Sequence, residues 1–175
     1  APTTYEELIA MEEWAIEQDK YSVAIRVPAF GCNHTTENVD KDYSALNKYK
    51  VMHWGEKVAL LAVGDFFAKG EAVATALADE GIDATLINPR YLSGEDADLL
   101  NELKKNHILV ATIEDGSLDG GFGERIARFY GPSDMKVINF GVKKKLYDRY
   151  EVSQLLADNH LTEEQMVEDI KKSMI

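Results

Sequence analysis

Residues Ile108 to Tyr130 read ILVATIEDGSLDGGFGERIARFY, and this stretch decides the fold class of the chain. It opens with a continuous apolar, β-rich run over 108–113, which is typical of a strand buried on both faces of a parallel sheet. A glycine-rich turn follows, after which Phe122, Ile126 and Phe129 recur at helical spacing. Strand, turn and helix together predict half of a βαβ unit.

The same rhythm of strand and helix continues on both sides of this stretch. Further apolar runs cover 58–63, 84–88 and 136–140, and the strand starts recur about every 25 to 28 residues. A shorter strand is expected within 49–54. This spacing is that of successive βαβ units. We therefore predict an α/β fold, doubly wound, with a mixed, mostly parallel sheet and helices on both faces.

Several helix starts carry a capping signature, in which a hydroxyl residue is followed three positions later by an acid or amide. Each of these pairs is expected to satisfy backbone N–H groups in the first turn of a helix. The pairs are Thr3 with Glu6, Thr4 with Glu7, Ser93 with Asp96, and Thr162 with Gln165.

The beginning of the chain has an unusual order of elements. A helix is expected from the first threonines to about Gln18, and Tyr21–Val27 is predicted to be a strand that ends at Pro28. Because a βαβ unit normally begins with a strand, this order resembles the tail of a preceding domain. We expect a helix–strand remnant over 1–30, a polar linker over 31–48 and the main domain over 49–175.

Composition narrows the possible classes of partner and compartment. The net charge of −12 argues against nucleic acid or an anionic membrane, since phosphate groups need clustered basic residues. The run Lys143–Lys145 is interpreted as a solvated face. The single cysteine, Cys32, fits a reducing compartment, which we take to be the cytoplasm. No apolar run reaches membrane-spanning length.

The glycine loop could present backbone N–H groups to an anion at a helix N-terminus. Gly120, Gly121 and Gly123 are the candidate anion-binding residues. The order is not that of a dinucleotide fingerprint, and acidic residues flank the loop. We favour a structural turn, with a free-standing α/β module that binds a small anion or nucleotide at Gly116–Gly123 as the alternative.

Other candidate sites give weaker patterns. Asp115 and Asn139 could imitate the diphosphate and magnesium motif of thiamine-diphosphate enzymes, although Glu114 replaces a glycine there. No metal site and no catalytic residue is predicted. The spacing of the single cysteine and the four histidines matches neither a zinc site nor a nucleophilic set; these residues are Cys32, His34, His53, His107 and His160. Arg26 lies at the end of a predicted strand and is a candidate carboxylate or phosphate clamp; a surface ion pair is the alternative.

The order of several short motifs resembles the C-terminal domain of the transketolase family, with most similarity to its deoxyxylulose-phosphate synthase branch. The similarity covers nearly the whole chain, and its opening resembles the end of a pyrimidine-binding domain. The motifs are Gly55-Glu56-Lys57, Asn88-Pro89-Arg90, Ile113-Glu114-Asp115, Gly120-Gly121-Phe122-Gly123, Asn139-Phe140-Gly141 and Leu161-Thr162.

This resemblance implies a non-catalytic part of a larger transferase that moves two-carbon units. The parent enzyme would use thiamine diphosphate and Mg²⁺, held in N-terminal domains or a subunit outside this chain, so the chain alone would bind no cofactor. Scaffolding and contact within a homodimer are the implied roles. Arg26 matches an arginine near the substrate phosphate, but Ala29 stands where the synthase usually has a second arginine. A paralogue with another substrate and a complete small enzyme stay open as alternatives.

Overall fold

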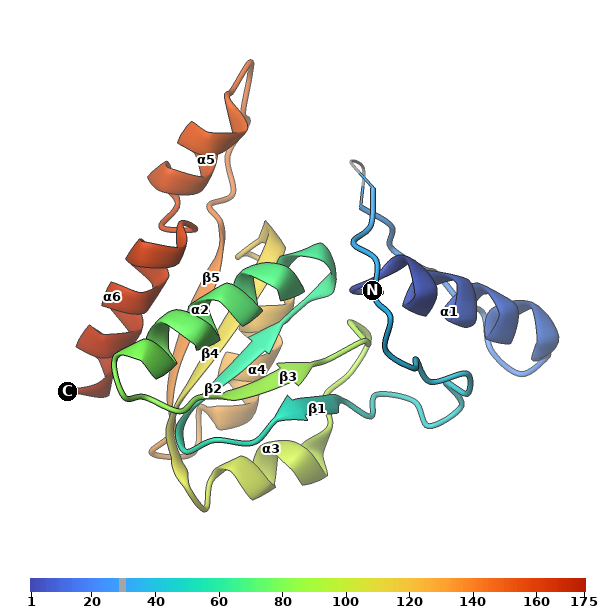
Figure 1. Cartoon of the computed structure of the whole chain (residues 1–175), viewed down its shortest axis with the longest axis horizontal. Coiled ribbons are helices and arrows are strands. Elements are labelled where there is room, and N and C mark those ends of the chain that lie inside the picture. The colour runs from blue at the N-terminus through green and yellow to red at the C-terminus, as the bar shows by residue number, and fades with distance from the viewer. Residues whose placement is uncertain (29–30) are drawn as a thin grey trace.

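In the computed structural model, which describes residues 1–28 and 31–175, the apolar run at the start of the opening stretch becomes the second-last strand of a five-stranded sheet. The strand order is β1-β3-β2-β4-β5. Strands β2, β3, β4 and β5 run parallel, and β1 pairs with β3 in the antiparallel sense. The predicted mixed, mostly parallel sheet is therefore confirmed (Figure 1). The strands are β1 (Lys50–His53), β2 (Lys57–Ala62), β3 (Thr85–Asn88), β4 (His107–Ser117) and β5 (Lys136–Val142).

Helices cover both faces of this sheet, as predicted for a doubly wound fold. Helices α2 and α6 pack on one face, and α3 and α4 pack on the other (Figure 1). The short 3-10 turn Gly64–Phe66 joins β2 to α2. The helices are α1 (Tyr5–Glu17), α2 (Phe67–Asp79), α3 (Ala97–Leu103), α4 (Phe122–Tyr130), α5 (Val152–Asp158) and α6 (Glu163–Met174).

Successive residues of the central strands point alternately into the core on one face of the sheet and into the core on the other. Leu60 and Ala111 face α2 and α6, whereas Leu61 and Val110 face α3 and α4, and all four are fully buried. This arrangement explains why the strands read as continuous apolar runs without alternation. The core therefore lies on both sides of the sheet, and the carboxyl ends of its parallel strands point toward the N-terminal helix α1 (Figure 1).

Two of the four predicted capping pairs form and two do not. Thr3 does not pair with Glu6, because its amide and hydroxyl both donate to the Glu7 carboxylate. Thr4 accepts a hydrogen bond from the Glu7 amide at 3.2 Å, and Thr162 accepts one from Gln165 at 3.3 Å. Ser93 does not cap α3: its hydroxyl donates to Asn47 instead, and Asp96 is the N-cap. The prediction was wrong because Asp is itself a good N-cap, placed one residue before the helix.

Two strand boundaries also differ from the prediction. Strand β4 continues beyond Ile113 to Ser117, because Ser117 still pairs with Val142 of β5. The strand predicted over Tyr21–Val27 is not formed; this segment lies next to no other strand among the described residues. A strand is defined by pairing as well as by residue type, so local pattern alone overstated it. Ala29 lies outside the described residues.

Candidate functional site

The sheet has one topological switch point, between the neighbouring strands β2 and β4. The chain leaves β2 toward α2 on one face and leaves β4 toward α4 on the other. In open α/β sheets ligands usually bind in the crevice outside the carboxyl ends of such strands. Here the crevice is bounded by the turn Gly64–Phe66 and by the loop between β4 and α4.

Arg26 reaches this crevice from the N-terminal segment and forms an ion pair with Asp115 of β4. A Cβ atom on Gly64 would lie 3.4 Å from Nη2 of Arg26, and one on Gly116 would lie 3.9 Å from Nη1. The guanidinium therefore rests beside two glycines, which leave room for it. Its side chain keeps 41% of its surface exposed, so its remaining donors are accessible.

Asp65 is a member of this cluster that the sequence analysis did not identify. Burial raises the pKa of the Asp65 carboxyl, and the nearby Asp115 carboxylate raises it further. Its position two residues after the buried run 58–63 was the available signal, because ligand sites of open α/β sheets lie at the carboxyl ends of the strands.

Glu114 occupies the donors that the glycine loop could have offered to a ligand. Its carboxylate is 4% exposed and accepts hydrogen bonds from the amides of Phe122 at 2.9 Å and Gly123 at 2.8 Å. Burial raises the pKa of this carboxyl, and the two amides partly offset that effect. The first turn of α4 is thus capped by the protein's own acid.

The amides of the other two candidate glycines also donate within the loop. The Gly120 amide donates to Glu124 at 2.6 Å, and the Gly121 amide donates to the Leu118 carbonyl at 3.2 Å. All three glycines proposed as anion-binding residues therefore have internal partners. A cavity of about 290 Å³ lies beside the loop, and its walls carry Arg26 and Arg125 together with Glu114 and Asp119. This geometry supports the structural turn over an anion cradle.

Asp115 and Asn139 do not form a shared site. Asn139 lies within β5 and accepts a hydrogen bond from the Thr112 hydroxyl at 2.8 Å, under Gly123. Asp115 pairs with Arg26 instead. Among the described residues no group of three or more histidine, cysteine, aspartate or glutamate side chains is arranged to hold a metal. These residues do not fit thiamine diphosphate with Mg²⁺.

The four histidines have separate partners, and none of these contacts involves Cys32. His34, His53 and His160 each lie within 2.9 Å of a carboxylate oxygen, those of Glu6, Asp83 and Asp169 respectively. His107 is buried between the Leu103 carbonyl and the Thr85 hydroxyl. Each histidine therefore contributes to the structure at its own position, and the four do not form a common site.

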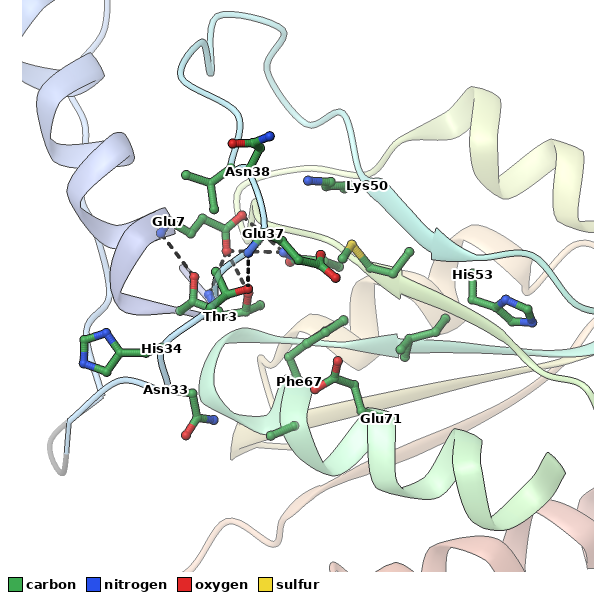
Figure 2. A pocket seen from close by; sticks show the side chains of 17 residues that line it. Thr3, Glu7, Asn33, His34, Glu37, Asn38, Lys50, His53, Phe67 and Glu71 are labelled. Carbon is green, nitrogen blue, oxygen red and sulfur yellow. Dashed lines mark hydrogen bonds between the residues drawn. The ribbon is translucent and has the colours of Figure 1, made fainter. Parts of the chain in front are cut away.

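A second cavity, of about 400 Å³, lies where the N-terminal segment meets the sheet (Figure 2). Glu7 projects into it from α1 and is 5% exposed; its carboxylate accepts hydrogen bonds from Thr3 at 2.7 Å and from Asn88 at 3.2 Å. Lys50 lines it from β1 and Glu71 from α2 (Figure 2). The hydrogen bond between Asn88 and the Glu7 carboxylate ties α1 to the end of β3 beside this cavity.

Comparisons with known proteins agree with this architecture. Residues 47–166 match the family described as "Transketolase, C-terminal domain". The 1-deoxy-D-xylulose-5-phosphate synthase of Lysinibacillus sphaericus is 30% identical over 162 residues, which are 90% of this chain and 25% of that protein. The synthase of Clostridium tetani is 29% identical over 99% of this chain and 28% of its own length.

Solved structures give the same picture of the fold. One solved structure is a split-gene transketolase, described as an inactive tetramer of four β subunits. Its TM-score is 0.68 at 26% identity, and the match covers 82% of this chain and 47% of that one. A 2-oxoglutarate:ferredoxin oxidoreductase from Magnetococcus marinus shares the fold alone, with a TM-score of 0.50 and 16% identity over 74% of this chain and 20% of its own. This chain spans about a quarter of the length of the curated relatives it matches. Since the family match covers more than half of its residues, the chain belongs to the transketolase C-terminal domain family.

Proposed function

We propose that this chain is the C-terminal, non-catalytic part of a thiamine-diphosphate-dependent enzyme that transfers two-carbon units, of the 1-deoxy-D-xylulose-5-phosphate synthase or transketolase type. The proposal places residues 1–30 at the end of a pyrimidine-binding domain, 31–48 in a linker and 49–175 in the C-terminal domain. Thiamine diphosphate and Mg²⁺ would bind to N-terminal domains or a subunit of the same enzyme. The chain alone is then inactive, and its roles are scaffolding and subunit contact.

One observation carries this proposal: the hydrogen-bond donors beside the crevice at the switch point are taken by the protein's own carboxylates. Glu114 takes the amides of Phe122 and Gly123, which a ligand anion would need. Asp115 takes one side of the Arg26 guanidinium. The carboxyl groups of Asp65, Glu114 and Asp115 lie around the Arg26 guanidinium, which suits structural support and disfavours an independent site for a phosphate.

Arg26 is the one residue that we propose to contact the substrate of the assembled enzyme. It lies at the carboxyl ends of β2 and β4, beside Gly64 and Gly116, and remains partly exposed. Arginine binds carboxylate and phosphate groups in a forked geometry, so the exposed edge of its guanidinium can hold the anionic end of a substrate.

Assembly into a homo-oligomer is part of the same proposal, with a dimer as the simplest form. Helix α1 exposes Tyr5 and Ile16, of which Ile16 retains 84% of its surface. Side chains of this kind are covered in subunit interfaces. The related split-gene chain is described as a tetramer of one subunit type, which supports self-association here.

Within the described residues no helix is long and apolar enough to cross a bilayer. We also propose that the enzyme is cytoplasmic.

The test compares the chain alone with a chimera in which it replaces the matching region of the Clostridium tetani synthase. Calorimetric titration of the chain with thiamine diphosphate and Mg²⁺ should show no binding, whereas the chimera should bind the cofactor and form deoxyxylulose phosphate. In the chimera, Arg26→Ala should lower kcat/KM at least tenfold, and the exposed control Arg128→Ala should leave it unchanged. Micromolar cofactor binding by the chain alone would overturn the proposal.

A further inference from the structure

Asp65 lies at the start of a helical segment, where an aspartate would usually cap the first turn. It does not do so in the described structure, because neither the 3-10 turn Gly64–Phe66 nor α2 has a hydrogen bond to a capping side chain. The Asp65 carboxyl instead makes a hydrogen bond with the carboxyl group of Asp115 on β4. The side chain of Asp65 therefore acts in the crevice rather than as a helix cap.

The sheet brings these two carboxyl groups together. The Val63 amide donates to the Ile113 carbonyl at 2.9 Å, which continues the parallel pairing of β2 with β4 by one residue. Asp65 and Asp115 each follow two residues later, at the carboxyl ends of their strands. The contact between the two acids is thus built by the neighbouring positions of β2 and β4 in the sheet.

The Arg26 guanidinium completes this cluster. It forms an ion pair with Asp115, and its Nη2 atom would lie 3.4 Å from a Cβ atom on Gly64, the residue before Asp65. A guanidinium carries a single positive charge and can balance one carboxylate. Since Asp115 takes that charge, the second acid of the cluster has no full counter-charge of its own among the described residues.

The two acids therefore need a proton between them. Two ionised carboxylates repel each other and neither has a hydrogen to donate. Burial raises the pKa of Asp65 above its ordinary value of 3.8, and the charge of Asp115 and the hydrogen bond to it raise it further, whereas Arg26 partly offsets these effects. The proton is thus on Asp65, and Asp115 keeps the charge that pairs with Arg26.

Charged groups on the neighbouring elements have other surroundings. Glu114 accepts two amides of α4, and the amine of Ala1 donates to a backbone carbonyl at 2.7 Å. Arg125 lies 3.6 Å from a glutamate carboxylate, and Lys69 of α2 lies 5.6 Å from the centre of an aromatic ring. Asp119 also lines the cavity and is exposed. Asp115 and Arg26 are therefore the charged groups that act most directly on Asp65.

We propose that Asp65 is a positioning residue for Arg26. The protonated Asp65 carboxyl donates a hydrogen bond to Asp115, which holds one edge of the guanidinium, so that the other edge faces the anionic end of the substrate. The inference rests on the proposed function for the contact between Arg26 and substrate. When the pH rises and Asp65 ionises, the crevice gains a negative charge and the anion should bind more weakly.

Carbon-13 NMR of the whole chain tests the shared proton. The side-chain carboxyl of Asp65 should titrate above its ordinary pKa of 3.8. Asp115→Asn removes the repelling charge and should move this titration closer to 3.8. Titration of Asp65 at its ordinary pKa, or a titration that Asp115→Asn leaves unchanged, would overturn the inference.

The NMR signals of the Arg26 guanidinium test the positioning role. Asp65→Asn keeps a hydrogen-bond donor at the same place, whereas Asp65→Ala removes it. Slow rotation of the guanidinium, the mark of a fixed ion pair, should therefore persist in Asp65→Asn and be lost in Asp65→Ala. Asp79→Ala, at the exposed end of the same helix, is the control and should leave the signals unchanged. Equal signals in all of these variants would overturn the inference.

Kinetics of the chimera with the Clostridium tetani synthase test the consequence for substrate. Asp65→Ala should raise KM about fivefold and change kcat by less than about twofold, because Arg26 acts in binding. In the wild type KM should rise with pH as Asp65 ionises, and Asp65→Asn should remove that rise while keeping the low-pH value. The same pH profile in the wild type and Asp65→Asn would overturn the inference and assign the titration to another acid, such as Glu114.

Two outcomes separate this inference from the proposed function. If Arg26→Ala leaves the kinetics of the chimera unchanged while Asp65→Ala still frees the guanidinium, the substrate contact falls and the positioning contact stands. If Arg26→Ala lowers kcat/KM while Asp65→Ala changes neither KM nor the guanidinium signals, the proposed function stands and the positioning role falls.

Discussion

Glu114 and Gly123 are joined by a hydrogen bond of 2.8 Å, in which the Gly123 amide donates to Oε1 of the buried carboxylate. The other carboxylate oxygen receives the Phe122 amide. Gly121 occupies the N-cap position of α4 and has no side chain with which to cap it. A residue from the preceding strand therefore does the work of an N-cap and closes the loop over the crevice.

Removing this carboxylate should destabilise the protein. Glu114→Ala leaves two buried amides without an acceptor, and we expect the free energy of unfolding to fall by about 3 kcal/mol. Urea denaturation measures the change. The matched control is Glu124→Ala, which removes an exposed carboxylate from the first turn of α4 and should cost less than about 1 kcal/mol. Equal losses in the two variants would contradict the capping role.

Gly123 should tolerate no side chain, because α4 packs closely on the sheet at this position. A Cβ atom there would collide with Oγ1 of Thr112 and lie 2.8 Å from Cγ of Asn139. Gly123→Ala is expected to lower the free energy of unfolding by about 2 kcal/mol through overpacking. Gly131→Ala is the control, since its Cβ would meet neighbours at an ordinary 3.5 Å. Thermal denaturation should show a lower Tm for Gly123→Ala and little change, or a slight rise, for Gly131→Ala.

His107 should make stability depend on pH. Burial lowers the pKa of His107 below its usual 6.5, so the folded state holds this imidazole neutral while the unfolded chain binds a proton. Its contribution is present above pH 6.5 and is lost as the pH falls through the folded-state pKa. Urea unfolding at several pH values between 7.5 and 5 should show a smaller acid-side loss for His107→Gln than for the wild type. Parallel curves would count against this assignment.

The pair of Arg26 and Asp115 should add little to stability. Their side chains are 41% and 28% exposed, and exposed ion pairs are screened by water and salt. A double-mutant cycle with Arg26→Ala and Asp115→Ala is expected to give a coupling energy below about 1 kcal/mol. A coupling energy above 2 kcal/mol would mean that Arg26 is held mainly for structure, and would weaken its assignment to substrate binding.

Much of the fold could be predicted because its signals are local. The strand–turn–helix order around 108–130 and the spacing of the apolar runs gave the α/β class and the parallel sheet. The caps at Thr4 and Thr162 were also readable, since each bond spans only three residues. The end of β4 was misjudged because Asp115 and Gly116 favour turns locally, whereas pairing with β5 resumes at Ser117 after an irregularity in the register.

The candidate site was less predictable because its contacts join distant parts of the chain. Arg26 was a candidate clamp with a surface ion pair as the alternative, but its ion-pair partner Asp115, 89 residues away, was not predicted. Asp65 enters the crevice only because β2 and β4 are neighbours in the sheet. The role of Glu114 depends on a strand that runs far enough to bring its carboxylate under α4.

The sequence by itself determined the order of elements, the two-sided burial of the central strands and most helix starts, because each depends on residues within a few positions of one another. Only the tertiary structure decided that the glycine loop is occupied by Glu114, that Arg26 meets Asp115, and that Ser22–Val27 is left without a neighbouring strand. The physical reason is that hydrogen-bond donors are shared across the fold, and which acceptor takes each donor depends on distances that local residue patterns do not contain.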